Sequence, residues 1–141
     1  MPRTTLGEDQ QRSLLQAARA ARLNAYAPYS KFLVGAAVLD EQGQVHAGCN
    51  VENAAYPQGV CAEAAALSAL VLSGGRRATA LLVVGEGPNW VTPCGGCRQK
   101  LREFGEPDTP VLVADGQGVQ RWFTLDELLP YSFGPEHLKP A

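Results

Sequence analysis

The chain has 141 residues and lacks any apolar run of the roughly eighteen residues that a membrane-spanning helix requires. Its N-terminal segment also lacks the apolar stretch typical of a secretory leader, so a cytoplasmic protein is expected. Basic residues are few and scattered: 12 lysines and arginines face 14 aspartates and glutamates, for a net charge of -2. Because polynucleotide-binding proteins usually carry a basic stripe, the sequence favours a small-molecule substrate over nucleic-acid or membrane partners.

Metal-ligating residue types are also scarce. The cysteines are Cys49, Cys61, Cys94 and Cys97. In a cytosolic chain of this size they indicate metal ligation or redox chemistry better than a disulfide framework. The two histidines, His46 and His137, lack ligand spacing relative to the cysteines and are expected at the surface.

The composition, 45% hydrophobic and 18% charged, is typical of a globular chain, and its length fits a single domain over residues 1–141. Strands that alternate with helices predict a sheet covered on both faces, and an early hairpin makes that sheet mixed. The sequence therefore predicts an α/β fold with three α/β/α layers around a mixed five-stranded sheet. Expected helices cover 9–27, 61–73, 94–104 and 124–129, and expected strands cover 32–39, 45–49, 79–85, 110–114 and 119–123.

Two short segments carry the chemistry. Cys61-Ala62-Glu63 and Pro93-Cys94-Gly95-Gly96-Cys97 each open an expected helix after a loop. The free N–H groups and partial positive charge of a helix N-terminus lower the pKa of a thiol and favour the thiolate that binds metal. Three thiolates suit a catalytic zinc ion, whose fourth position stays open for water. Cys94 and Cys97 alone would also fit a redox pair, but Pro93 and the distant Cys-Ala-Glu segment favour metal.

Glu63 is the candidate acid/base. It follows the ligand Cys61 by two residues, close enough to reach a water molecule on the metal without binding the metal itself. Hydrolytic deamination needs such a group because protons move from water to the ring and to the leaving amine. A largely closed apolar pocket is expected to raise the pKa of this carboxyl.

These motifs resemble the short, all-cysteine form of the cytidine deaminase family. The resemblance runs from about Ser30 to Phe133 and includes Asn50-Val51-Glu52-Asn53-Ala54 and Leu128-Leu129-Pro130 besides the cysteine segments. It implies a cytidine deaminase-like fold, one Zn²⁺ per subunit and a homotetramer. The implied reaction is the hydrolysis of free cytidine and 2′-deoxycytidine to uridine and 2′-deoxyuridine, with release of ammonia.

The resemblance also implies a set of substrate contacts. These are Phe32, Asn50, Glu52, Tyr56, Ala62 and Phe133. Asn50 and Glu52 should hold the ribose hydroxyls, Phe32 should pack on the nucleoside, and the backbone at Ala62 should read the pyrimidine edge with Glu63. Tyr56 and Phe133 lie where family members reach into a neighbouring subunit.

One position departs from the family pattern. The family commonly has Arg after the catalytic glutamate, where this chain has Ala64. Because three thiolates leave a charge of -1 on a zinc cluster, a cation there favours ionisation of the bound water. Arg98 is a candidate for that role.

Alternatives stay open at this point. Deaminases of blasticidin-type nucleoside antibiotics share the size, the cysteine pattern and the missing arginine, but they lack an acidic residue at the position of Glu52. A non-catalytic zinc module would use Cys49 as a fourth ligand and would not need Glu63. A polynucleotide or tRNA editor would usually carry His in the first motif and a basic surface.

Overall fold

A computed structural model describes residues 6–139 of the chain. Residues 1–5 and 140–141, which the expected single domain includes, lie outside this range. Among the described residues, no helix is both long and apolar enough to cross a membrane.

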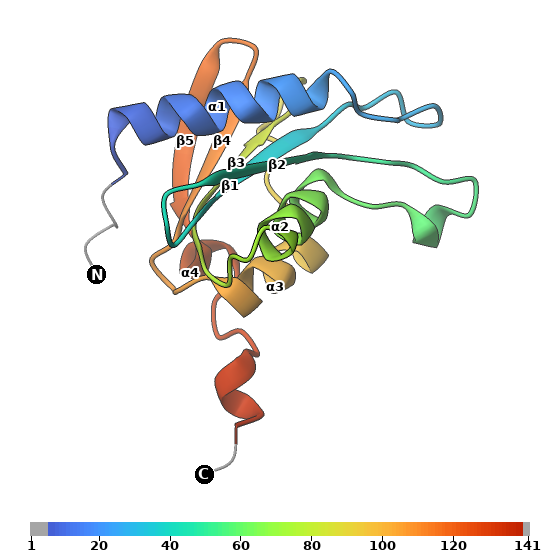
Figure 1. Cartoon of the computed structure of the whole chain (residues 1–141). Coiled ribbons are helices and arrows are strands. Elements are labelled where there is room, and N and C mark those ends of the chain that lie inside the picture. The colour runs from blue at the N-terminus through green and yellow to red at the C-terminus, as the bar shows by residue number, and fades with distance from the viewer. Residues whose placement is uncertain (1–5, 140–141) are drawn as a thin grey trace.

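A five-stranded mixed sheet forms the centre of the fold, with strand order β2-β1-β3-β4-β5. Only β3 and β4 pair in parallel, and the other neighbours are antiparallel. The α1 helix covers one face, and α2, α3 and α4 cover the other, so the predicted three-layer arrangement is confirmed (Figure 1). The strands are β1 Gly35–Asp40, β2 Val45–Cys49, β3 Ala78–Val84, β4 Pro110–Asp115 and β5 Gly118–Thr124. The helices are α1 Glu8–Arg22, α2 Ala62–Leu72, α3 Gly95–Phe104 and α4 Leu125–Leu128, with 3-10 turns at Tyr56–Gln58 and Pro135–His137.

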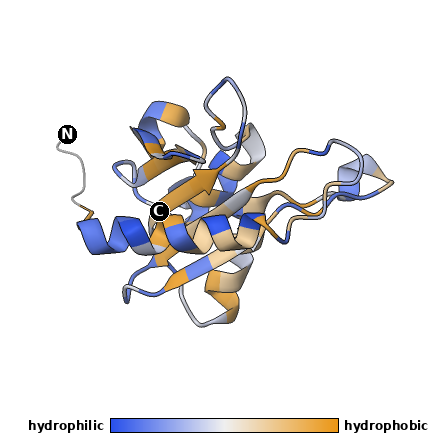
Figure 2. Ribbon diagram, turned by 90° about the horizontal axis from the view of Figure 1, so that it is seen from above, coloured by the Kyte–Doolittle hydropathy of each residue, from blue (hydrophilic) through white to orange (hydrophobic). Residues whose placement is uncertain are grey.

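The central strands are apolar because both of their faces are buried. Along β1, Ala36 and Val38 face the core beneath α2, whereas Ala37 and Leu39 face the core beneath α1. Apolar strand residues lie inside the layers, and the outer side of α1 carries many hydrophilic residues (Figure 2). Because both faces of β1 are buried, its residues 35–39 form a continuous apolar run and do not alternate between apolar and polar residues.

Two element boundaries differ from the expectation by more than one residue. The α1 helix ends at Arg22 rather than at residue 27, because the Tyr26 N–H donates to the Asn50 carbonyl, 2.9 Å away, in a strand-like bridge. The first strand begins at Gly35 rather than at Phe32. The intervening loop, residues 23–34, lies beside residues 50–52 and contributes to the cavity described below.

The hairpin of β1 and β2 buries a polar pair, so the expectation of a surface His46 is wrong. His46 Nε2 lies 2.8 Å from Asp40 Oδ2, and the two side chains are only 10% and 6% exposed. Burial opposes ionisation of Asp40, but hydrogen bonds from His46 and from the Gln44 and Gln42 N–H groups hold the pKa of Asp40 below its usual value. This pair fixes the turn between the strands.

Close packing joins the sheet to α2. A Cβ atom placed on Gly48 of β2 would lie 2.5 Å from the Ala66 N atom and 2.7 Å from the Ala62 carbonyl oxygen. Only glycine allows this approach of strand backbone to helix backbone. The contact fixes the first turns of α2, which carry Glu63, against the sheet.

Candidate active site

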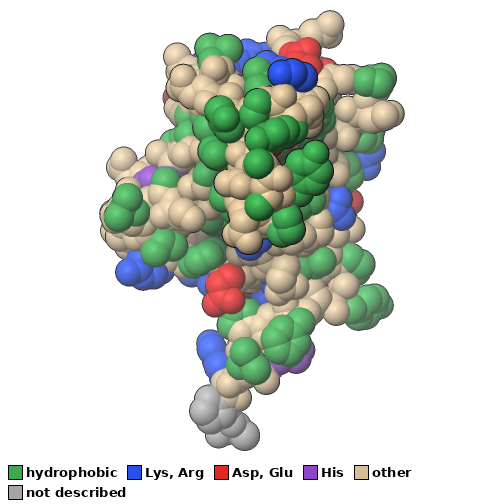
Figure 3. All heavy atoms as spheres, turned by 90° about the vertical axis from the view of Figure 1, so that its right-hand side faces the viewer, with side chains coloured by type: hydrophobic (Ala, Val, Ile, Leu, Met, Phe, Trp, Pro, Cys, Tyr) green, Lys and Arg blue, Asp and Glu red, His purple; other side chains and the backbone are tan. Residues whose placement is uncertain are grey.

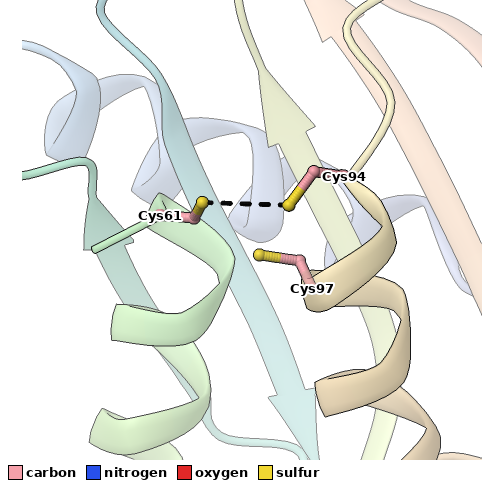
Figure 4. Close-up of side chains that lie close together, drawn as sticks. All are labelled: Cys61, Cys94 and Cys97. Carbon is pink, nitrogen blue, oxygen red and sulfur yellow. Dashed lines mark hydrogen bonds between the residues drawn. The ribbon is translucent and has the colours of Figure 1, made fainter. Parts of the chain in front are cut away.

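The N-termini of two helices meet at one end of the sheet. Cys61 is the N-cap residue of α2 and Cys94 is the N-cap residue of α3, both with extended backbone (φ -76°, ψ 154° and φ -67°, ψ 167°). Cys97 lies in the first turn of α3. The three side chains point toward one another from the two helices (Figure 4). The sequence prediction that these thiols converge is confirmed.

The spacing of the sulfurs fits a tetrahedral metal site. Cys61 Sγ and Cys94 Sγ are 3.9 Å apart, and all three sulfurs lie within 4.8 Å of one another. Zinc–sulfur bonds of about 2.3 Å in a tetrahedron place two sulfurs about 3.8 Å apart, whereas a disulfide needs about 2 Å. Cys49, half-buried in β2, does not belong to this cluster. Three thiol donors thus fit zinc with one position left for water.

The thiols differ in their ease of ionisation. Burial raises the pKa of Cys61 and of Cys97, and the charges of Cys94 and of the Glu63 carboxylate add to the effect at both thiols. Burial also opposes ionisation of Cys94, but hydrogen bonds from the Cys97 N–H and from the other thiols lower its pKa in net. The expectation that helix N-termini lower thiol pKa values therefore holds for Cys94 alone.

Glu63 lies in the first turn of α2 and is 5% exposed. Burial raises the pKa of its carboxyl, as the sequence predicts, against smaller opposing contributions from its own N–H and from the Cys97 side chain. A buried carboxyl with a raised pKa can both accept and return a proton near neutral pH.

A cavity of about 280 Å³ opens above the thiols and Glu63. Five of the predicted site residues line this cavity together with Cys61 and Cys94. They come from the loops and from α2, and they are Phe32, Asn50, Glu52, Ala62 and Glu63. Its lining residues are Ser30, Phe32, Val34, Asn50, Glu52, Cys61, Ala62, Glu63, Val91, Thr92 and Cys94.

Four of these lining residues were not predicted: Ser30, Val34, Val91 and Thr92. Ser30 and Val34 flank Phe32 in the loop that the sequence pattern assigns partly to a strand. Val91 and Thr92 directly precede the Pro-Cys motif, and their position before a helix that carries two ligands is the signal that could have identified them.

Asn50 and Glu52 are held by the loop of residues 23–34. Asn50 Oδ1 accepts the Val34 N–H at 2.9 Å, and its Nδ2 donates to the Phe32 carbonyl at 2.9 Å. Glu52 Oε1 accepts the N–H groups of Tyr29 and Ser30. Both side chains are therefore fixed at the wall of the cavity.

The remaining predicted contacts lie outside this cavity. Tyr56 lines an adjoining cavity of about 370 Å³ that shares Ser30 and Glu52 with the first. Phe133 is 56% exposed in the C-terminal segment, where its ring stacks on His137 at a centroid distance of 5.0 Å. Neither ring lines the cavity above the thiols.

The hypothesis that Arg98 offsets the thiolate charge stays a prediction, and the hydrogen bonds of its guanidinium go to oxygen atoms. The guanidinium donates to the Pro93 carbonyl at 2.7 Å, the Leu128 carbonyl at 2.8 Å and the Thr92 hydroxyl at 3.0 Å. None of the hydrogen bonds found for Arg98 among residues 6–139 goes to a sulfur. Arg98 ties the turn before α3 to the end of α4 and so supports the position of Cys94.

Zinc retention should depend steeply on pH. Since the pKa values of Cys61 and Cys97 are raised, zinc must displace protons from these thiols, and we expect apparent affinity to fall by about tenfold or more per pH unit between about pH 8 and pH 6. Competition with a chromogenic chelator measures this slope. Cys49→Ser should keep the parent affinity, whereas Cys61→Ser should lose it; a pH-independent affinity would contradict the three-thiol site.

Comparisons with known proteins agree with this geometry. Residues 8–113 match the family model described as the cytidine and deoxycytidylate deaminase zinc-binding region. A cytidine deaminase from Sporosarcina psychrophila is 43% identical over 128 residues, covering 91% of this chain and 94% of the relative. A cytidine deaminase from Mycobacterium tuberculosis is 44% identical over 118 residues, covering 84% and 85%.

A solved structure supports the fold as well as the sequence match. The crystal structure of cytidine deaminase from Burkholderia pseudomallei superposes with a TM-score of 0.81 at 45% identity, over 86% of this chain and 98% of that one. The matched family region contains all three converging cysteines and Glu63. The chain therefore belongs to the zinc-dependent cytidine deaminase family.

Proposed function

We propose that this chain hydrolyses free cytidine and 2′-deoxycytidine to the corresponding uridines and ammonia. The observation that carries the proposal is the convergence of three thiols and one buried carboxyl, Glu63, at a cavity whose wall carries Asn50 and Glu52. The reaction consumes one water: the C4–N bond breaks, a C4–O bond forms, and the amine leaves as ammonia.

The chain supplies a place for the metal and a proton carrier. A zinc ion held by Cys61, Cys94 and Cys97 would lower the pKa of its water so that hydroxide is available near neutral pH. Glu63 accepts the proton of the attacking water, delivers a proton to the ring nitrogen N3, and assists proton transfer to the departing amine. Its pKa, which burial raises, brings the carboxyl closer to the range in which it can both take up and release a proton.

The cavity wall supports the choice of a nucleoside. Phe32 offers an aromatic surface for packing, and the backbone at Ala62 lies beside Glu63, where an amide-like pyrimidine edge needs hydrogen-bonding partners. Asn50 and Glu52 provide polar groups for sugar hydroxyls on the same wall. We assign Phe32 and the Ala62 backbone to the base, and Asn50 and Glu52 to the ribose.

A blasticidin-type nucleoside antibiotic is the second candidate substrate. Ala64, in place of the family's arginine, favours it. The ionised Glu52 favours cytidine, because a fixed carboxylate at the cavity wall suits the hydroxyl donors of an unmodified ribose.

We propose that four copies assemble. Exposed aromatic and aliphatic side chains gather on the face formed by the loops on either side of β1 and β2 (Figure 3). This set includes Tyr26, Tyr29, Phe32, Val51, Tyr56 and Val60. Contiguous apolar patches of this kind usually mark interfaces, and a homotetramer would cover the patch while bringing Tyr56 and Phe133 toward a neighbouring cavity.

A cytoplasmic location is proposed on chemical grounds. The four cysteines are free thiols, and a thiol metal site needs a reducing compartment to avoid oxidation.

Replacing the proton carrier should abolish turnover without releasing the metal. For Glu63→Gln we expect kcat for cytidine to fall by at least about 100-fold, because the amide cannot carry a proton. The loss of cytidine absorbance measures kcat, and metal analysis should find parental zinc content. Glu8→Gln, on the exposed side of α1, is the matched control and should keep parental activity. A zinc-loaded parent that deaminates only a blasticidin-type substrate would overturn the cytidine proposal.

Subunit complementation tests the assembly. If Tyr56 serves a neighbouring cavity, Tyr56→Ala and Glu63→Gln should each be weakly active alone but regain activity when co-expressed, because mixed tetramers contain intact composite sites. Sedimentation should give about 60 kDa for four chains of 15.0 kDa. An active 15.0 kDa monomer, or no complementation in mixed oligomers, would contradict the proposal.

A further inference from the structure

The cavity wall on the sugar side is built from two segments that lie side by side. The Tyr26 N–H donates to the Asn50 carbonyl at 2.9 Å, and the Glu52 N–H donates to the Tyr26 carbonyl at 2.8 Å. These backbone bonds hold the loop between α1 and β1 against the segment after β2. Side chains then determine how the wall presents its polar groups.

Ser30 joins the two segments through both its backbone and its side chain. Its N–H donates to Glu52 Oε1 at 3.1 Å, and its hydroxyl donates to Glu52 Oε2. The same hydroxyl accepts the Phe32 N–H at 3.0 Å. Ser30 therefore links the carboxylate of Glu52 to the backbone of the aromatic residue in the cavity.

The Glu52 carboxylate is only partly satisfied by these bonds. Oε1 accepts two N–H groups, from Tyr29 and Ser30, and among residues 6–139 Oε2 accepts only the Ser30 hydroxyl. The Ser30 bonds hold the pKa of Glu52 below its usual value, so the group is ionised at neutral pH. Since each carboxylate oxygen has two acceptor directions, Oε2 keeps one for a hydroxyl donor in the cavity that Glu52 lines.

The backbone at this point is strained. Lys31, between Ser30 and Phe32, has a φ of 63°, in the left-handed region that a lysine rarely adopts. Such strain persists where surrounding contacts hold it, and it is often found at binding sites. Here it lets Ser30 face Glu52 while Phe32 lines the cavity.

We propose that Ser30 is a positioning residue that orients the Glu52 carboxylate toward a sugar hydroxyl and so determines the affinity for nucleosides that carry it. This inference rests on the proposed function, because the hydroxyl belongs to the ribose or deoxyribose of the substrate. Ser30 takes no part in the chemistry at C4, so its loss acts on KM rather than on kcat.

If the Ser30 hydroxyl acted through Phe32 instead of Glu52, its loss would change the KM values in a different way. Ser30 also holds the Phe32 N–H, and a displaced Phe32 would weaken packing on the base. That effect would be equal for substrates with and without sugar hydroxyls. Comparing cytidine with 2′,3′-dideoxycytidine therefore separates the two routes.

The test measures KM and kcat of the zinc-loaded protein for both substrates. Ser30→Ala should raise KM for cytidine by about tenfold, as expected for losing a hydrogen bond to a charged group, with kcat nearly unchanged. KM for 2′,3′-dideoxycytidine should change by less than about twofold. Ser30→Thr, which keeps the hydroxyl, should restore most of the affinity for cytidine.

A double-mutant cycle keeps the inference testable if Ser30→Ala also lowers stability. In a Glu52→Gln background, Ser30→Ala should add less than about a twofold rise in KM for cytidine. An equal rise for both substrates, full additivity with Glu52→Gln, or an unchanged KM for cytidine would overturn the role of Ser30. A parent without turnover of either substrate would instead overturn the proposed function, and this inference with it.

Discussion

The meeting of two helix N-termini is the constraint on which the site depends. Cys61 and Cys94 occupy the N-cap positions of α2 and α3, where the extended cap residue leaves its side chain beside free N–H groups. The close approach at Gly48 holds α2 on the sheet, and the Arg98 bonds hold the turn before α3. The packing of the core therefore positions the three sulfurs.

Burial has opposite consequences for binding and for catalysis. It raises the pKa values of Cys61, Cys97 and Glu63, which favours the protonated form of each group. A zinc ion held by Cys61, Cys94 and Cys97 would favour their thiolate forms. In the proposed mechanism, Glu63 stays free of the metal and exchanges a proton. Ala64 carries no charge, and the Arg98 guanidinium is hydrogen-bonded to backbone carbonyls. The two helix N-termini add positive potential at the cluster.

Much of the fold and the centre of the site could be predicted from the sequence, because local patterns determine them. The capping box at Thr124 and Glu127, the hairpin around Gly43 and the spacing of Cys94 and Cys97 each reflect contacts within a few residues. The approach of Cys61 to that pair is expected from the two motifs taken together. The loop of residues 23–34 could not be predicted, because Ala25 continues the apolar period of the helix. The helix ends earlier because Tyr26 forms backbone hydrogen bonds with the distant residues Asn50 and Glu52. The roles of Ser30 and Arg98 depend on such long-range bonds and have no local pattern.

X-ray absorption at the zinc edge, on protein purified with its native metal, tests the central claim most directly. The account predicts one zinc per chain with three sulfur neighbours at about 2.3 Å and one lighter atom completing the tetrahedron. That shell would establish an open catalytic position beside Glu63. A shell of four sulfurs would bring Cys49 into the site and indicate a structural module, and a shell without sulfur would contradict the three-thiol centre altogether.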